Sequence, residues 1–302
     1  MPNSVPLYQV DAFTAERFRG NPAAVCILDG VSHANVDDSI KSKIAAEMNL
    51  SETAFVEPSP SGEKGSFKLR WFTPTVEVDL CGHATIAAAA ALLQGEGLQA
   101  DELYFETRSG TLTVKHTKDG LFHISVPSLP PTDSLPGTPE EMDEVLEVLG
   151  IGNTGIDGFV NGASVHYCRK LRYLMVACNG SMGDGAVAAF EALAPDYRAL
   201  HERCSALDIF AVMVTAADPT GTNDLLLRFF APSAGIDEDP VTGSAYAVAG
   251  PFWAQVLKKQ QLRARQCSAR GGDIIVTADA TPGRVDVAGY AVIVSKGVMY
   301  LD

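Results

Sequence analysis

The chain of 302 residues lacks a hydrophobic run long enough to cross a membrane. Its longest apolar stretch, Ala84 to Leu93, is interrupted by Thr85 and has only ten residues, whereas a membrane-spanning helix needs about 20. The N-terminal residues Met1 to Pro6 show neither the basic start nor the apolar stretch of a signal peptide. These absences predict a cytoplasmic protein without a membrane segment.

Basic residues are also scarce relative to acidic ones. Lys and Arg total 23 against 37 Asp and Glu, a formal net charge of −14. A strongly acidic surface repels phosphate backbones and anionic lipid headgroups. We therefore expect no nucleic-acid partner and no membrane-surface role.

Metal-binding spacing is absent among the six cysteines and six histidines. The chain contains no C-x-x-C pair, and no two histidines are spaced to share one metal ion from one element. The chain also lacks a G-x-S-x-G elbow, which disfavours a hydrolase. The glycine-rich segment Gly180–Gly185 lacks the order of a phosphate-binding loop and is predicted to be a surface loop. We expect reduced thiols and no metal.

Both halves of the chain combine strands with one markedly apolar helix. In each half, strands lead into a short glycine-containing loop, Cys81–Thr85 or Asp239–Ser244, and an apolar helix follows. The second of these helices is predicted over Ser244–Leu257. This layout predicts an α+β fold with two sheets, each curled round its own central helix.

The best linker candidate is Pro127–Pro139, which holds five prolines. It divides the chain into an N-terminal α/β domain over 1–126 and a C-terminal α/β domain over 127–287. The pattern leaves open whether the final strands, about 288–302, return to the first domain.

Glu52 and His83 are candidates for acid–base chemistry. Glu52 stands at the mouth of a predicted strand, where partial burial would raise its pKa and suit it to shuttle protons. The residues alone nevertheless favour an exposed strand-edge glutamate or a helix-cap partner. His83, between Gly82 and Ala84, fits a structural histidine and an acid–base or substrate-binding group equally well.

The starts of the two apolar helices are candidates for binding an anion. Free backbone N–H groups and the helix dipole favour negative charge at a helix N-terminus. Gly82 and Gly243 would let a substrate approach the backbone closely. Thr85 and Ser244 have the chemistry of ordinary N-caps, and the residues favour capping over ligand contact.

Cys81 and Asp239 flank the same two helix starts. A Cys81 thiolate would be stabilised by the helix dipole, but a buried and inert cysteine is the commoner case, so Cys81 ranks second. Asp239 belongs to the acidic run Asp237–Asp239, which is typical of a solvated turn, although Pro240 fixes the backbone beside the helix start.

Six segments spread over most of the chain carry a family resemblance. They are Asp11–Phe13, Phe18–Val25, Asn49–Phe55, Trp71–Pro74, Leu80–Thr85 and Glu238–Ala245. Together, and in this order, they resemble the PhzF-like, or phenazine biosynthesis-like, family. A further segment, Cys267–Gly272, is especially similar to the animal MAWD-binding-protein branch.

The resemblance implies a diaminopimelate-epimerase-like fold of two similar domains with the active site in the cleft between them. It also implies proton transfer on a small carboxylic acid without a cofactor. Glu52 would be the proton shuttle, and His83 and Asp239 would orient the substrate and steer protons. The substrate-binding residues would be Asn21, Gly82, Gly243 and Ser244.

One departure from related epimerases bears on the mechanism. Those enzymes use two cysteines, one on each face of the substrate carbon. Cys81 matches the first, whereas Pro240 and Val241 stand where the second would lie, and neither side chain carries a proton. We therefore expect an isomerase with a single carboxylate as acid and base.

Two alternatives remain. One is an amino-acid epimerase or racemase, which requires a second base. The other is a non-catalytic adaptor that retains the cleft, since the animal branch is named for a protein partner. Homodimerisation and a protein partner are expected by analogy with the family alone.

Overall fold

The computed structural model describes residues 4–33, 36–132, 134–151, 163–178 and 186–301. The chain divides into two compact units. The first unit is formed by Met1–Ser125 together with Asp286–Asp302, and the second by Val126–Val285. The predicted loop Gly180–Gly185 lies outside the described residues.

The first unit contains a mixed sheet. Its strands β2 and β3 are parallel, as are β4 and β6, and the other neighbours whose register is established are antiparallel. The strand order is β16 (Ala291–Tyr300), β1 (Ser4–Ala12), β2 (Asn21–Ile27), β3 (Glu52–Pro58), β4 (Ser66–Phe72), β6 (Glu102–Thr107), β7 (Gly110–His116) and β8 (Phe122–Pro127), with the short β5 (Glu77–Val78) against β4.

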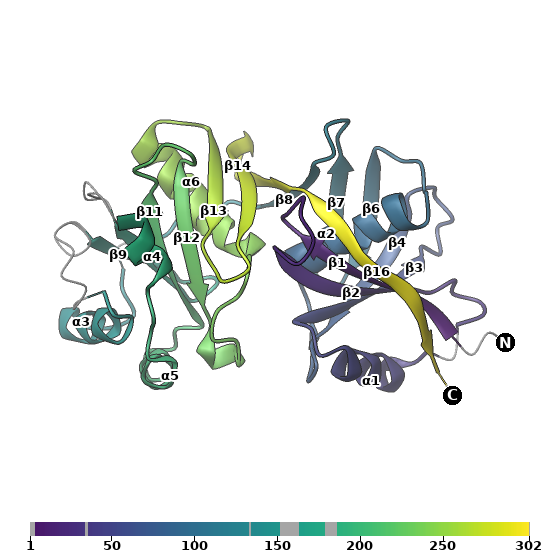
Figure 1. Ribbon diagram of the computed structural model, residues 1–302, viewed down its shortest axis with the longest axis horizontal. Coiled ribbons are helices and arrows are strands. Elements are labelled where there is room, and N and C mark those ends of the chain that lie inside the picture. The colour runs from purple at the N-terminus through teal and green to yellow at the C-terminus, as the bar shows by residue number, and fades with distance from the viewer. Residues whose placement is uncertain (1–3, 34–35, 133, 152–162, 179–185, 302) are drawn as a thin grey trace. The chain divides into compact units, whose positions relative to one another are not determined.

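Helix α2 (Gly82–Ala90) is the core of the first unit (Figure 1). Every residue after Gly82 is buried, and the helix packs against β1, β2, β3, β7 and β16. A helix that is apolar on all sides must be surrounded, and its small alanine side chains let the strands approach closely. The helix continues as a π-helical turn, Ala91–Gly95.

Helix α1 (Asp38–Met48) packs on the outer side of β3 and β4. Asp37 caps its N-terminus by accepting a hydrogen bond from the backbone N–H of Ile40, and Asn49 ends it in the left-handed conformation.

The second unit repeats this plan. Its strand order is β14 (Gly272–Thr281), β13 (Gln261–Gln266), β12 (Leu225–Phe230), β11 (Ala211–Ala217), β10 (Tyr173–Cys178) and β9 (Ala163–Cys168), and β15 (Arg284–Gly289) contains the boundary between the units. The central helix α6 (Tyr246–Leu257) is largely buried and packs against β13 and β14.

The described part of the second unit also contains the helices α3 (Pro139–Val148), α4 (Ala186–Glu191) and α5 (Tyr197–Ala206). Buried side chains of α3 and α5 share one apolar cluster with β10 and β11. The α+β class with one central helix in each curled sheet is therefore confirmed. Among the described residues, no helix has both the length and the apolar character that a membrane span requires.

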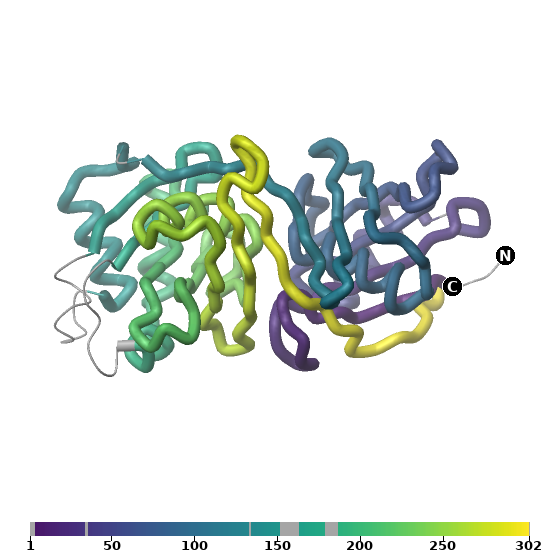
Figure 2. Tube along the Cα trace, turned by 90° about the horizontal axis from the view of Figure 1, so that it is seen from above, coloured from purple at the N-terminus to yellow at the C-terminus, as the bar shows by residue number. Residues whose placement is uncertain are grey.

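The last strand of the chain pairs with the first. Strand β16 runs antiparallel to β1 from Ala291 opposite Ala12 to Tyr300 opposite Ser4. Figures 1 and 2 both show this strand, in yellow, beside the purple N-terminal strands. The C-terminal segment therefore belongs to the first unit.

Gly20 provides a test of the loop between β1 and β2. It has φ +63°, and a Cβ there would lie 2.1 Å from the carbonyl oxygen of Ala12. Gly30 has φ +76°, and a Cβ added there would meet no atom within 4 Å. We expect Gly30→Ala to cost about 1 kcal/mol through backbone strain and Gly20→Ala about 3 kcal/mol or more. Denaturant unfolding of both variants measures the difference, and equal losses would contradict the steric argument.

Candidate active site

Asn21 is the first residue of β2, and a tight loop delivers it. The buried Asp11 carboxylate accepts a hydrogen bond of 2.7 Å from the backbone N–H of Phe18, which ties the loop to the end of β1. Phe18 and Gly20 both have positive φ, so the chain turns back sharply. The fully buried Asn21 side chain then lies with Nδ2 3.3 Å from Nδ1 of His83.

Glu52 opens β3 directly after α1. The packing of Ile44 and Ala45 fixes the helix in the core, and the left-handed Asn49 turns the chain into the strand. The side chain of Glu52 is 14% exposed. The expectation of an exposed strand-edge glutamate is therefore wrong, because the start of β3 lies under the first turn of α2 and not at the sheet's rim.

His83 and Cys81 come from the start of α2. Cys81 is the N-cap residue in an extended conformation, and its side chain makes no cap hydrogen bond. His83 is the second residue of the helix, with a side chain 7% exposed. Because the helix is packed on all sides, the backbone holds these two side chains in fixed positions beside Glu52.

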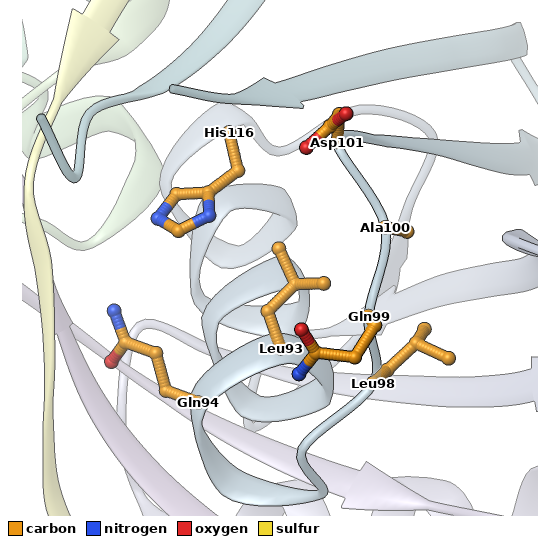
Figure 3. A pocket seen from close by; sticks show the side chains of 7 residues that line it. All are labelled: Leu93, Gln94, Leu98, Gln99, Ala100, Asp101 and His116. Atoms are coloured by element: carbon orange, nitrogen blue, oxygen red, sulfur yellow. The ribbon is translucent and has the colours of Figure 1, made fainter. Parts of the chain in front are cut away.

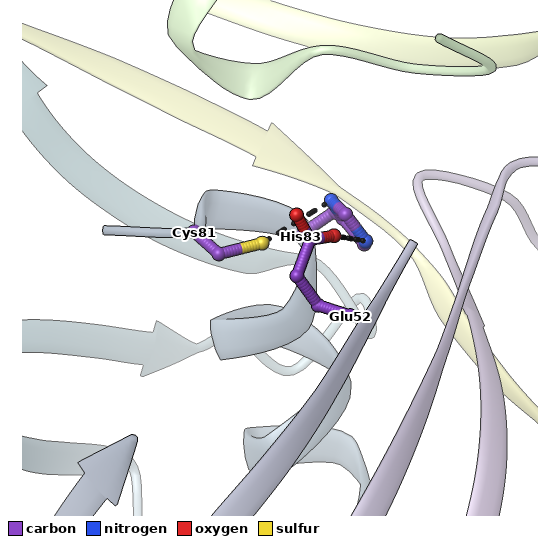
Figure 4. A group of neighbouring side chains, drawn as sticks. All are labelled: Glu52, Cys81 and His83. Carbon is purple, nitrogen blue, oxygen red and sulfur yellow. Dashed lines mark hydrogen bonds and ion pairs between the residues drawn. The ribbon is translucent and has the colours of Figure 1, made fainter. Parts of the chain in front are cut away.

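The three side chains form one cluster (Figure 4). Nε2 of His83 lies 3.2 Å from Oε2 of Glu52, and Nδ1 of His83 lies 3.4 Å from Sγ of Cys81. Ser51 adds its hydroxyl 3.2 Å from Nε2 of His83. The imidazole therefore bridges a carboxyl group on one side and a thiol on the other.

Burial raises the pKa of the Glu52 carboxyl above its ordinary value, and hydrogen bonds from Ser51 and Cys81 oppose the shift. Taking the carboxylate out of water disfavours its charged form, so the group binds a proton at a higher pH than a surface glutamate does. This places its protonation closer to neutral pH, where one group can both accept and return a proton.

The partners of His83 favour one tautomer. The amide nitrogen of Asn21 approaches Nδ1 as a hydrogen-bond donor, whereas the one thiol proton of Cys81 is shared between Nδ1 and Glu52. The Asn21 contact makes Nδ1 the acceptor and places the ring proton on Nε2. Nε2 lies 3.2 Å from Oε2 of Glu52.

Neither hydroxyl acts as the predicted N-cap. Thr85 lies inside α2 and donates a hydrogen bond of 2.5 Å to the carbonyl oxygen of Cys81. Ser244 lies in the middle of a 3₁₀ turn, Gly243–Ala245, so α6 begins at Tyr246 and not at Ser244. The capping interpretation fails in both cases because the helical backbone begins before the hydroxyl.

Gly82 is the first residue of α2 and is half-buried. A Cβ added there would meet no atom within 4 Å. Open space therefore lies beside Gly82 at a helix N-terminus, a position that favours an anion.

The residues expected from the second half lie in the second unit. Asp239 accepts a hydrogen bond from the hydroxyl of Thr242, and its carbonyl oxygen accepts one of 2.8 Å from the Gln266 amide. Ser244 shares a hydrogen bond of 3.0 Å with the hydroxyl of Tyr173. Burial, and then the Asp239 charge, raise the pKa of Tyr173, whereas the Ser244 hydrogen bond opposes the shift.

The acidic run before Asp239 is only partly the solvated turn that its composition suggests. Glu238 makes a two-pronged ion pair with Arg228, whose side chain is 6% exposed, at 2.7 and 2.9 Å. Arg228 also donates to backbone carbonyl oxygens of the segment 190–193. The ion pair fixes the backbone next to Asp239 because breaking it would leave a buried charge unpaired.

The structure therefore gathers Asn21, Glu52, Cys81, Gly82 and His83 in the first unit. It gathers Asp239, Gly243 and Ser244 in the second. Sequence reasoning did not assign a binding or proton-transfer role to four polar neighbours, which are Ser51, Tyr173, Thr242 and Gln266. Of these, only Ser51 and Thr242 gave a signal, since each lies beside an expected residue in the chain.

A separate cavity of about 390 Å³ lies beside the π-helical turn in the first unit (Figure 3). Gln94, Gln99 and Asp101 are exposed there, and none of the expected site residues lines it. Its lining is Leu93, Gln94, Leu98, Gln99, Ala100, Asp101 and His116. It brings together no buried pair like that of Glu52 and His83.

Comparison with known proteins identifies the family. The family model for phenazine biosynthesis-like proteins, PhzC-PhzF, matches residues 10–297. The chain belongs to this family, as its sequence motifs predict.

Curated relatives cover nearly the whole chain. A phenazine biosynthesis-like domain-containing protein of Mus musculus is 36% identical over 98% of this chain and 99% of its own. A Pseudomonas aeruginosa protein described as an uncharacterized isomerase is 40% identical over 98% of each chain.

Solved structures share the fold. A PhzF-family protein of Enterococcus faecalis has a TM-score of 0.81 at 35% identity, covering 99% of this chain and 100% of its own. A probable proline racemase of Agrobacterium radiobacter K84 has a TM-score of 0.56 at 12% identity, covering 99% and 93%. The latter likeness concerns the fold alone.

The buried Glu52 predicts a pH-dependent difference in stability between the wild type and Glu52→Gln. Because folding raises the pKa of Glu52, the folded wild type loses stability as pH rises from the ordinary value, about 4.3, through the folded pKa. The neutral glutamine does not titrate. We expect the Tm of Glu52→Gln relative to wild type to increase between about pH 4 and pH 8.

Thermal unfolding across this pH range measures the difference. Glu63→Gln, in an exposed turn, is the control and should show no such trend. A constant difference between Glu52→Gln and wild type would contradict a raised pKa.

Proposed function

We propose that the protein is an isomerase that moves a proton between two carbons of a small carboxylic acid, without a cofactor, with Glu52 as the only acid and base. The observation that carries the proposal is the buried carboxyl group of Glu52 at 3.2 Å from His83. A relative 40% identical to the chain is described as an isomerase, which supports the same class.

In this mechanism the Glu52 carboxylate removes a proton from one carbon of the substrate. The protonated Glu52, whose carboxyl proton exchanges with water, then delivers a proton to a second carbon on the same face, while the double bond shifts between them. Atoms and electrons balance without an oxidant or reductant. His83 steers the reaction by holding the Glu52 carboxyl group in place. It stabilises that carboxyl group in both its ionised and its protonated state.

The N–H groups at the start of α2 and the side chain of Asn21 are proposed to bind the substrate. We assign Gly243 and Ser244 to its carboxylate and Asp239 to its orientation, as the family resemblance implies. The ion pair of Glu238 supports this assignment because it fixes the backbone beside Asp239.

The residues around Glu52 fit a mechanism with one base better than a mechanism with a cysteine on each face of the substrate carbon. Cys81 is the only cysteine beside Glu52 among the described residues, and Val241, in the motif where a second thiol would stand, is fully buried and carries no proton. An epimerase would need a second proton carrier on the other face of the substrate carbon.

The decisive test is proton exchange with solvent. Substrate candidates, small unsaturated or amino-substituted carboxylic acids, are incubated with the full-length protein in D₂O and followed by NMR. We expect Glu52→Gln to lower the rate of deuterium incorporation by at least about 10²-fold, the usual contribution of a general acid–base group. Glu63→Gln should retain the wild-type rate.

The labelled position distinguishes the alternatives. Deuterium at the alpha carbon with loss of optical purity would identify an epimerase or racemase and overturn the single-base mechanism. Full activity in Glu52→Gln would also overturn it. No exchange with any acid, together with a tight protein partner, would favour the adaptor.

Gly82→Ala tests substrate binding at the start of α2. The residue has open space around it and is not held at a positive φ, so alanine should preserve or slightly raise the Tm. The added methyl lies where the substrate would approach the backbone. We expect KM to rise about tenfold or more with a smaller change in kcat, since lost ground-state binding appears in KM. An unchanged KM would remove Gly82 from the binding site.

We also propose a cytoplasmic location. All six cysteines are buried thiols that form no disulfide. Free thiols are typical of a reducing compartment. A homodimer and a protein partner remain predictions.

A further inference from the structure

The cluster of Glu52, Cys81 and His83 has the donor set of a transition-metal site. Sulfur, imidazole nitrogen and carboxylate oxygen are the three ligand types that zinc combines in proteins. One donor atom of each residue lies within 4.8 Å of the other two. Chain spacing gives no hint of this set, because Glu52 comes from β3 and the other two from the start of α2.

The separations within the cluster are close to those of a metal complex. Bond lengths of about 2.3 Å to sulfur and about 2.0 Å to nitrogen, at a tetrahedral angle, put the two ligand atoms about 3.5 Å apart. Sγ of Cys81 and Nδ1 of His83 are 3.4 Å apart. Glu52 shares a hydrogen bond with Cys81, and its ligand oxygen lies within 4.8 Å of the other two ligand atoms. Its 3.2 Å contact with His83 is to Nε2, the other ring nitrogen, so the carboxylate must turn away from Nε2 when an ion binds at Nδ1.

The surroundings also suit a cation. Oε2 of Glu52 is fully buried and accepts no well-aligned hydrogen bond from any described residue. Such an atom gains most from a new partner of positive charge. A carboxylate and a thiolate neutralise a divalent cation, so the occupied cluster would carry no net charge, as a buried site requires.

We propose that Glu52, Cys81 and His83 bind a thiophilic divalent cation of the Zn²⁺ type, which leaves a fourth position open. Binding displaces the thiol proton of Cys81, as for any cysteine ligand. It also engages the carboxylate that the proposed function needs as a base. A bound cation therefore blocks proton transfer by Glu52, and removal of the cation restores that transfer. This regulatory half of the inference rests on the proposed function.

Co²⁺ is a suitable probe because a cobalt–thiolate bond absorbs in the near ultraviolet. The full-length protein, freed of metal with a chelator, is titrated with Co²⁺ and then with Zn²⁺ as competitor. We expect a thiolate-to-cobalt band that saturates at one equivalent and disappears on addition of Zn²⁺. Cys81→Ser should abolish the band and weaken Co²⁺ binding by about tenfold or more, since one of three ligands is lost.

Cys204→Ala is the matched control, because Cys204 is a buried thiol of α5 in the second unit. It should keep the full band. Serine at position 81 occupies an N-cap, where it is a favoured residue, so the variant should fold normally. No band in the wild type, or an undiminished band in Cys81→Ser, would overturn the proposed site.

Proton exchange separates this inference from the proposed function. Loss of exchange in the presence of one equivalent of Zn²⁺, reversed by a chelator, supports the regulatory half. Exchange that is unaffected by bound Zn²⁺ overturns it and leaves the isomerase intact. A cobalt band without exchange in the metal-free protein would overturn the proposed function and leave the metal site standing.

Discussion

The candidate active site depends on the free energy of burying one carboxyl group, that of Glu52. Water stabilises a carboxylate strongly. The side chain of Glu52 is mostly buried, so a few polar neighbours take the place of most of that water. The cost can be tolerated because the group can take up a proton and because His83 faces it at 3.2 Å. The tight loop before Asn21, the end of α1 and the alanine-rich α2 all act to hold this one environment in place.

Much of the fold could be predicted because its signals are local. The apolar run after Gly82 can only be a buried helix, and Asn49 is a typical helix end. The helix starts were less predictable. Thr85 and Ser244 have the chemistry of N-caps, but the first hydrogen-bonded turn forms upstream of each, and a hydroxyl inside that turn has the same sequence signature as one that precedes it.

For the site, the residues alone gave every candidate except Asn21, and the family resemblance gave Asn21 and the roles of all the candidates. Glu52 looked like an exposed glutamate because burial depends on what packs over the start of β3, and that segment, α2, comes later in the chain. The Cys81–His83–Glu52 cluster was invisible for the same reason: spacing rules detect ligands on one element, not on two that tertiary packing brings together. Tyr173, which shares a hydrogen bond with Ser244, gave no signal at all.

The pairing of β16 with β1 has a consequence for biosynthesis. The second unit is continuous in the chain, whereas the first needs β16, a strand that follows the whole second unit. During translation the edge of β1 therefore stays unpaired until β16 emerges, and by then every strand of the second unit has been made. The second unit can thus complete its sheet before the first, the opposite of the usual order, in which the N-terminal part of a nascent protein folds first.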